Sequence, residues 1–560
     1  MIPMPDTAFA RFWSRLPAAT KQSFFAGVVM GLVCHLYLFT NLIPNHDAVF
    51  HLFQCDYGTA SGRWFLPLVL AWDGDYNMPW LQGVLSLLCL AGTVCITTRL
   101  LRIEKPLAIV ITAAFCTAFP TVAATFTYMF TADAYFFGLF LAALAAYAVW
   151  RMPIWGLPLG TILLILSMGI YQSYFPVAAV LMVGALLFDC LEGRASFGRT
   201  LLHGVKMVAT LALGIVVYMA VARLARLATM ASGGLSDYMG ISSMGSLSLS
   251  ELPELVRQSL ESYETYFLQN ELGWNFSFIP LLVIAAWVSG VVLLATLLLR
   301  RQVGVLRGLL ALVLVGLYPL AGSLIHIMVA GAAVHDLMIY GLLYALILPL
   351  ALASFAATHA DEMGGFRASV QALLSWIIMI AMALTSYSYI VADNKAYLAM
   401  EVSLEQISAY SNRLVSAIQN VEGYTTEMPV VLWGASAAES MLTDLTPEQN
   451  EIVLTGALRA ITYRSQYSYG NFLNRFMAFP NDVYTDDMPD EVRQAIGDIN
   501  AKMPIYPQQG SVQIVNGYIV VFDDVGLSNI CYTLCRKLFR VSLGDFQPSG
   551  LIGKLLYFLL

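Results

Sequence analysis

The sequence predicts an α-helical protein that crosses a membrane many times and carries a small C-terminal α/β domain. Charge-poor hydrophobic blocks fill residues 22–391. Most are about 17 to 24 residues long, near the ~20 that a helix needs to cross a hydrocarbon core of ~30 Å. Such a core offers no water to pair with backbone N–H and C=O groups, so these blocks can only be helices. The composition agrees, with 59% hydrophobic and 12% charged residues.

The hydrophobic blocks divide by length into about eleven predicted spans. No small-residue cleavage site follows the first block, so we interpret it as an uncleaved span rather than a signal peptide. For the two short segments joined by Tyr171-Gln172, the alternative is a pair of half-helices. The predicted spans are 22–43, 79–98, 106–125, 129–150, 154–170, 172–189, 202–222, 277–299, 304–326, 336–358 and 370–391.

Lysine and arginine concentrate in every second connection between spans. Connections near residues 126, 171 and 331 hold none, whereas those near 102, 151, 196 and 302 hold at least one each. Because positive loops stay cytoplasmic, this pattern predicts a cytoplasmic N-terminus. It also predicts a transmembrane domain over 1–391 and an extracytoplasmic α/β domain over 392–560.

The polar segments outside the spans predict several local elements. Residues 231–249 are Gly/Ser-rich and predict a loop, and 251–267 predict an amphipathic helix on the membrane surface. A second such helix is expected between Arg63 and Trp72. In the tail, we expect a helix over 392–421, a strand at 429–434 and a hairpin at 512–522 around Asn516-Gly517.

Composition and motifs exclude some functions. The net charge of −7 argues against a nucleic-acid partner, because phosphate backbones need a basic surface. The tail has no phosphate-binding glycine loop, so we do not expect it to bind nucleotides. Most of the eight cysteines lie within spans and are typical of small buried hydrophobic residues. Cys531 and Cys535 in the tail are interpreted as free thiols on one helix face, with a disulfide as the alternative.

The first outside loop holds the main candidate residues. Asn45-His46-Asp47 follows the first span directly, and a carboxylate at a membrane edge is a functional candidate. The alternative is a solvated loop aspartate that caps a helix. Arg63-Trp64 supplies the only cation of this loop, and arginine suits phosphate or carboxylate. Its alternative is an interfacial arginine beside a membrane-belt tryptophan.

Acidic residues elsewhere in the first loop are weaker candidates. They are Asp56, Asp73 and Asp75, and Asp73-Gly74-Asp75 predicts a turn.

Further candidates stand at the same side of other spans. Asp133 begins the fourth span and is either a reactive carboxylate or one stabilised by the helix dipole. Tyr171 and Gln172 suit sugar stacking and hydrogen bonding, with interfacial packing as the alternative. Arg223 and Arg226 share a helix face and point to a phosphate, or to anchoring on lipid headgroups. His335-Asp336 opens the tenth span, either as a ligand or as a cap.

These candidates all lie at one membrane face, whereas the middles of the spans are almost free of charge. A proton-coupled transporter would need buried carboxylates or histidines, so chemistry at the outer interface is favoured. A transporter or flippase of a lipid-linked saccharide is the main alternative, and a non-catalytic scaffold is the third.

In its motifs the chain resembles the bacterial polytopic glucosyltransferases of the O-antigen-modifying Gtr type, within the GT-C class. The resemblance runs over most of residues 20–435. The motifs that carry it are Asn45-His46-Asp47, Gly62-Arg63-Trp64, the segment 74–80, Asp133 with Tyr135, 169–174, 392–397 and 429–434.

The resemblance implies a GT-C-like inverting hexosyltransferase in the bacterial cytoplasmic membrane, with its active site outside. Its donor would be a polyprenyl-phosphate-linked sugar, typically glucose, and its acceptor a cell-surface glycan such as O-antigen. Asp47 takes the place of the essential carboxylate of the first loop, with Asp133 as the rival base. The family often has two adjacent acids here, but this chain has His46 before Asp47, so a pair of acids does not carry over.

The remaining roles follow from the same resemblance. Relatives carry an arginine near the tenth span where this chain has His335-Asp336, so the phosphate is expected at Arg63, then at Arg223 or Arg226. The substrate is expected to contact His46, Trp64, Tyr171, Gln172 and His335. Membrane lipid is a further partner. No cofactor is expected, and a metal is neither required nor excluded.

Overall fold

The computed structural model divides the chain into two compact units. The first comprises Met1–Leu404 and Pro447–Arg459, and the second Glu405–Thr446 and Ala460–Leu560. The described residues are 4–53, 61–72, 74–228, 250–269, 276–299, 303–329, 333–359, 366–434, 454–457, 463–465, 467–485, 488–497, 499 and 503–522. Asp56, Asp73, the predicted loop 231–249, Cys531 and Cys535 lie outside them. The predicted domain boundary at 391 stays a prediction.

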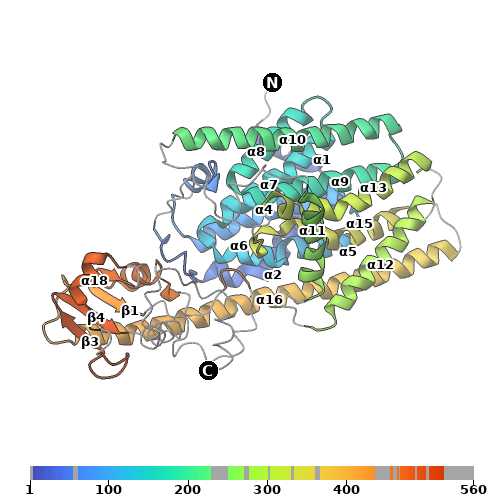
Figure 1. The fold of residues 1–560 in the computed structure, drawn as a ribbon. Helices are drawn as coiled ribbons and strands as arrows, with labels where there is room; N and C mark the ends of the chain where they lie inside the picture. Colours follow the sequence, from blue (N-terminus) through green and yellow to red (C-terminus); the bar gives the residue numbers. More distant parts are fainter. Residues whose placement is uncertain are drawn as a thin grey trace. The chain divides into compact units, whose positions relative to one another are not determined.

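The first unit is a bundle of helices (Figure 1). Among the described residues, short 3-10 turns interrupt it at η2 (Gln172–Tyr174), η4 (Asp336–Met338) and η5 (Tyr340–Leu343). Its helices are α1 (Pro5–Arg15), α2 (Ala18–Thr40), α3 (Leu66–Leu70), α4 (Pro79–Leu100), α5 (Pro106–Ala118), α6 (Pro120–Thr127), α7 (Met129–Arg151), α8 (Gly156–Ile170), α9 (Phe175–Glu192), α10 (Phe197–Ala228), α11 (Leu252–Phe267), α12 (Ile279–Leu298), α13 (Val305–Gly322), α14 (Leu324–Met328) and α15 (Tyr344–Thr358). Helix α16 (Phe366–Gln419) begins in this unit, and its residues from Glu405 onward belong to the second unit.

Within the described residues, ten helical segments are long and apolar enough to cross a membrane, which confirms a polytopic membrane protein. The predicted span 154–170 corresponds to α8, which has only 15 residues. At 1.5 Å per residue α8 measures about 22 Å, short of the ~30 Å core. Helix α8 ends at Tyr171, where the chain passes through η2 into α9.

Proline defines where many of the helices begin. Helices α4, α5, α6 and α9 each have proline in their first two positions, where a missing N–H costs nothing and φ already suits a helix. Successive spans alternate in direction, so the end of α2 and the start of α4 lie at one end of the bundle. We call this the α2–α4 end, defined by Thr40 and Pro79.

The two segments predicted to lie on the membrane surface are helical, and their position on a membrane stays a prediction. Helix α11 places Leu255, Tyr263 and Phe267 on a buried face, as the spacing over 251–267 predicts. The segment between Arg63 and Trp72 forms a shorter helix than expected, the five-residue α3. Helix α16 joins the last predicted span and the predicted tail helix into one helix of 54 residues.

The second unit is built on a four-stranded sheet of β1 (Val430–Trp433), β2 (Val483–Tyr484), β3 (Val512–Val515) and β4 (Tyr518–Phe522). The strand order is β2-β1-β4-β3. Strand β1 runs parallel to β2 and β4, and β3 pairs antiparallel with β4. Asn516 and Gly517 both have positive φ, the geometry of the tight hairpin turn that Asn-Gly predicts.

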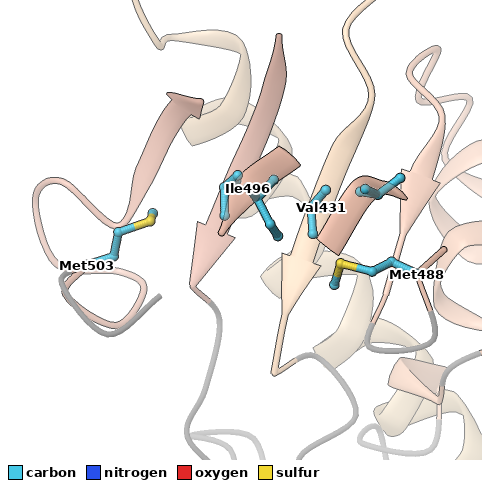
Figure 2. Packing of buried hydrophobic residues seen from close by; sticks show 6 residues of the cluster. Val431, Met488, Ile496 and Met503 are labelled. Carbon is cyan, nitrogen blue, oxygen red and sulfur yellow. The ribbon is translucent and has the colours of Figure 1, made fainter. Parts of the chain in front are cut away.

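One face of the sheet packs on α18 (Asp490–Ile496). Val431, Met488, Val492, Ile496, Met503 and Val520 form this core. Figure 2 shows Ile496 and Met488 on either side of Val431 of β1. The short elements α17 (Tyr469–Asn471) and η9 (Phe472–Phe476) precede β2. The predicted α/β character of the tail is therefore confirmed.

Candidate functional site

The loop after α2 places a histidine and an aspartate side by side at the α2–α4 end. Asn45 Oδ1 accepts a hydrogen bond from the backbone N–H of Ala48 at 2.7 Å, and this side-chain-closed turn fixes the residues between them. His46 Nε2 lies 3.5 Å from Asp47 Oδ1, and the Asp47 side chain is 32% exposed. The Asp47 carboxylate is thus held in place but remains accessible.

His46 is not the cation of this site. Burial lowers the pKa of His46, and the negative charge of Asp47 opposes this without cancelling it. Because an ordinary histidine has a pKa near ~6.5, His46 is mostly neutral at pH 7. It can exchange hydrogen bonds there, but a fixed positive charge has to come from another residue.

Arg63 is the cation of the same loop, and aromatic rings hold it. Its Nη1 donates a hydrogen bond to the Tyr135 hydroxyl at 2.8 Å. The guanidinium carbon lies 5.0 Å from the Tyr171 ring centre and 5.8 Å from that of Tyr135. The two rings stack on each other with centroids 4.9 Å apart. Cation–π contact and hydrogen bonding together fix the guanidinium in one position.

Two polar side chains hold the loop that carries Arg63. Gln172 Nε2 donates to the Ser61 carbonyl at 2.8 Å and to the Tyr218 hydroxyl at 2.7 Å. The Tyr218 hydroxyl in turn donates to the Gly62 carbonyl at 3.2 Å. The sequence prediction found Gln172 but missed Tyr218, because a tyrosine within an apolar span carries no distinctive signal.

Trp64 fixes the other side of the same loop. The backbone N–H of Phe65 donates to the Gly169 carbonyl at 2.9 Å. A side chain at position 169 would not fit, because a Cβ there would lie 2.8 Å from Trp64 Cε2. Trp64 therefore packs on the end of α8 and is placed to position the loop.

His335 belongs to the same cluster. Burial is the largest cause that lowers the pKa of His335, and the positive charge of Arg63 lowers it further, whereas Asp336 raises it. The two residues are therefore close enough for their charges to interact, although 272 positions separate them. The Arg63 cluster comprises Arg63, Tyr135, Tyr171, Gln172, Tyr218 and His335.

The remaining predicted residues lie on α7 and α10. Asp133 is the fifth residue of α7 and is 7% exposed, with its charge acting on Cys89 of α4. Arg223 is exposed and Arg226 is half-buried. Both lie on α10 beyond Tyr218, so the helix that holds the Arg63 loop also carries them.

A buried polar cluster was missed by the sequence analysis. Donor atoms of Cys34, His35 and Asp393 lie within 4.8 Å of one another. His35 Nε2 lies 2.7 Å from the Thr117 carbonyl and must donate to it, so the neutral ring accepts the 2.7 Å hydrogen bond from the Tyr397 hydroxyl at Nδ1. With both nitrogens bonded, His35 joins α2, α5 and α16, and the cluster is better explained by packing than by a metal.

Comparison with known proteins adds one finding. A family model described as Glucosyl transferase GtrII matches residues 36–346, more than half of the chain. The matched region contains Asp47, Arg63, Asp133, Gln172 and His335, whereas α16 lies beyond it. No curated protein and no solved structure matches the chain significantly.

Proposed function

This chain belongs to the Glucosyl transferase GtrII family, and we propose that it transfers glucose from a polyprenyl-phosphate donor to a cell-surface glycan such as O-antigen. Family membership makes it a multi-pass membrane glycosyltransferase. The lipid-linked donor, the glycan acceptor and the roles of single residues are the proposal. We place the reaction at the outer face of a bacterial cytoplasmic membrane, because the Lys/Arg-rich connections lie at the end of the bundle opposite to Asp47 and Arg63.

The observation that supports a phosphate-linked donor is the fixed position of Arg63. Its guanidinium is held by Tyr135 and Tyr171 before any substrate arrives. A hydrogen-bonding cation that is already held where charge develops stabilises a transition state without reorganisation. In this reaction the negative charge develops on the departing lipid phosphate, so we assign that phosphate to Arg63, with Arg223 and Arg226 as second candidates.

The chemical step then needs one base. An acceptor hydroxyl attacks the anomeric carbon, a new C–O bond forms, and the bond from that carbon to the phosphate oxygen breaks. The hydroxyl proton passes to the Asp47 carboxylate, and the electron pair leaves with the polyprenyl phosphate. A single displacement inverts the anomeric carbon. We assign Asp47 as the base because its carboxylate is accessible and follows the first span directly, with the more buried Asp133 as the rival.

Donor selectivity tests the proposal directly. Purified protein in a lipid bilayer is given an O-antigen glycan as acceptor and labelled glucose either on polyprenyl phosphate or on a nucleoside diphosphate. We expect the label to leave only the lipid-linked donor, because the described site lies at the membrane edge. Consumption of the nucleotide-linked donor alone would contradict the proposed donor class.

The hydrogen bonds from Gln172 that hold the Arg63 loop give a second prediction. Gln172→Leu removes the donor that pairs the Ser61 carbonyl, and an unpaired buried carbonyl costs about 1–3 kcal/mol. We expect kcat/KM for the donor to fall about tenfold, the equivalent of 1.4 kcal/mol, as Arg63 loses its fixed position.

Gln371→Leu is the matched control. Gln371 is 4% exposed and hydrogen-bonds Thr296 in the half of α16 remote from the α2–α4 end. We expect this variant to lose thermal stability while keeping the wild-type kcat/KM. An equal loss of kcat/KM in both variants would show that Gln172 acts through stability alone.

A further inference from the structure

A short turn at residues 454–457 belongs to the first unit, although these residues follow α16 in the sequence. Leu454 to Ala457 form the turn, closed by the Ala457 N–H on the Leu454 carbonyl at 3.0 Å. Thr127 Oγ1, at the end of α6, lies 3.2 Å from the Thr455 carbonyl and donates to it. Gly456 has a φ of +85°, and a Cβ there would lie 1.8 Å from Thr127 Oγ1. Only glycine fits this position, so the close packing of the turn on Thr127 requires glycine here.

The turn orients the carboxylate of Asp336. The Thr455 N–H donates to Asp336 Oδ2 at 2.7 Å, and the Asp336 carbonyl accepts a hydrogen bond from Thr121 at 2.6 Å. Burial raises the pKa of Asp336, while the bonds from Thr455 and the nearby His335 oppose this. With its backbone and one carboxylate oxygen both held, Asp336 points its other oxygen in a fixed direction.

That other oxygen faces an equally unsatisfied nitrogen. Among the described residues, Asp336 Oδ1 and His335 Nδ1 are buried atoms without a hydrogen-bond partner, and they lie 3.9 Å apart. This separation is too long for a direct hydrogen bond. It suits a single hydroxyl that lies about 2.8 Å from each atom. The two facing atoms are buried, whereas the His335 side chain as a whole is 27% exposed.

The position of the gap between Asp336 Oδ1 and His335 Nδ1 indicates which hydroxyl would lie there. The turn η5, which closely follows His335, contacts η2, which supports the Arg63 loop, and the charge of Arg63 acts on His335. The gap therefore lies in the same region as the cation assigned to the donor phosphate. In a polyprenyl-phosphate sugar, the phosphate is bonded directly to the sugar ring. A hydroxyl group next to the phosphate site therefore belongs to the donor sugar rather than to the acceptor.

We propose that Asp336, oriented by the Thr455-Gly456 turn, binds one hydroxyl of the donor sugar together with His335. Asp336 is then a specificity-determining residue, and the turn is its positioning element. This inference rests on the proposed function for the identity of the donor. It gives residues 454–457 a role in a site that the rest of the first unit builds.

Donor binding to protein in lipid nanodiscs tests the inference without an acceptor. The probes are polyprenyl-phosphate-glucose and a set of analogues that each lack one sugar hydroxyl. We expect one analogue to bind the wild type about 10- to 100-fold more weakly, as for a lost hydrogen bond to a charged group. We call this loss of affinity, relative to the intact donor, the penalty. In Asp336→Ala the penalty should disappear, and Gly456→Val, which displaces the turn, should reduce it at least threefold.

Two further variants separate recognition from folding. Asp336→Asn keeps the shape and still accepts the Thr455 N–H, so it is expected to fold and to show a smaller penalty than the wild type. Asp393→Asn alters another buried aspartate, 1% exposed, and should keep the full penalty. A wild type that discriminates against no analogue, or a penalty that is unchanged in Asp336→Asn and Asp336→Ala, overturns the inference. A wild type that does not bind the lipid-linked glucose at all overturns the proposed donor instead.

Discussion

Asp47→Asn is expected to lower the rate of glucose transfer by about 10²–10⁴-fold, the usual contribution of a positioned general base. Asparagine has nearly the same shape and can still lie beside His46, but it cannot take the proton of the acceptor hydroxyl. Because the Asp47 side chain is 32% exposed, the loss of its charge should leave the fold intact. The measurement is single-turnover transfer from a labelled lipid-linked donor, with thermal stability recorded alongside.

Asp75→Asn is the matched control for this variant. Asp75 lies in the same loop and has a positive φ of 63°, a backbone conformation that asparagine adopts readily. We expect Asp75→Asn to transfer glucose at the wild-type rate. Near-normal transfer by Asp47→Asn, together with a loss in Asp133→Asn, would move the base to Asp133.

Arg63→Ala is expected to lower kcat/KM for the donor by about 10²–10³-fold, as the loss of one preorganised charge-stabilising donor does in other enzymes. The neutral His46 cannot replace it. Arg63→Lys should recover only part of the loss, because an ammonium lacks the planar fork that stacks on Tyr171 and pairs with phosphate oxygens. Initial rates over a range of donor and acceptor concentrations measure both effects.

Arg151→Ala controls for a general loss of positive charge, since Arg151 is exposed at the last residue of α7. It should leave kcat/KM unchanged. If Arg63→Ala altered acceptor use while leaving donor dependence as in the wild type, the phosphate assignment would move to Arg223 or Arg226.

Hydropathy and turn chemistry predicted most of the architecture. Most predicted spans agree with one helix to within a few residues, because a hydrocarbon core permits only helices over such lengths. The exceptions are 106–125, which divides into α5 and α6, 202–222, which α10 extends at both ends, 336–358, where the α-helix begins only at Tyr344, and 370–391, which is part of the 54-residue α16. The Asn516-Gly517 hairpin was also predictable, since its positive φ values have a clear sequence signal. The Gtr-type resemblance is confirmed by the family match over residues 36–346.

The contacts that build the site were not predictable in the same way. His35 meets Tyr397, and Asp336 meets Thr455, across separations of 362 and 119 residues. No local periodicity encodes which distant residues a helix bundle brings together. The role of Gln172 as support for Arg63 likewise appears only when η2 is placed beside the Ser61 loop.

The most direct test of the account is transfer by the purified protein in a lipid bilayer, supplied with labelled polyprenyl-phosphate-glucose and an O-antigen glycan. The account predicts that wild type moves the label to the glycan and releases polyprenyl phosphate, and that Asp47→Asn does neither at a comparable rate. Saturable donor binding without any transfer by the wild type would contradict it and would favour a carrier of lipid-linked sugars.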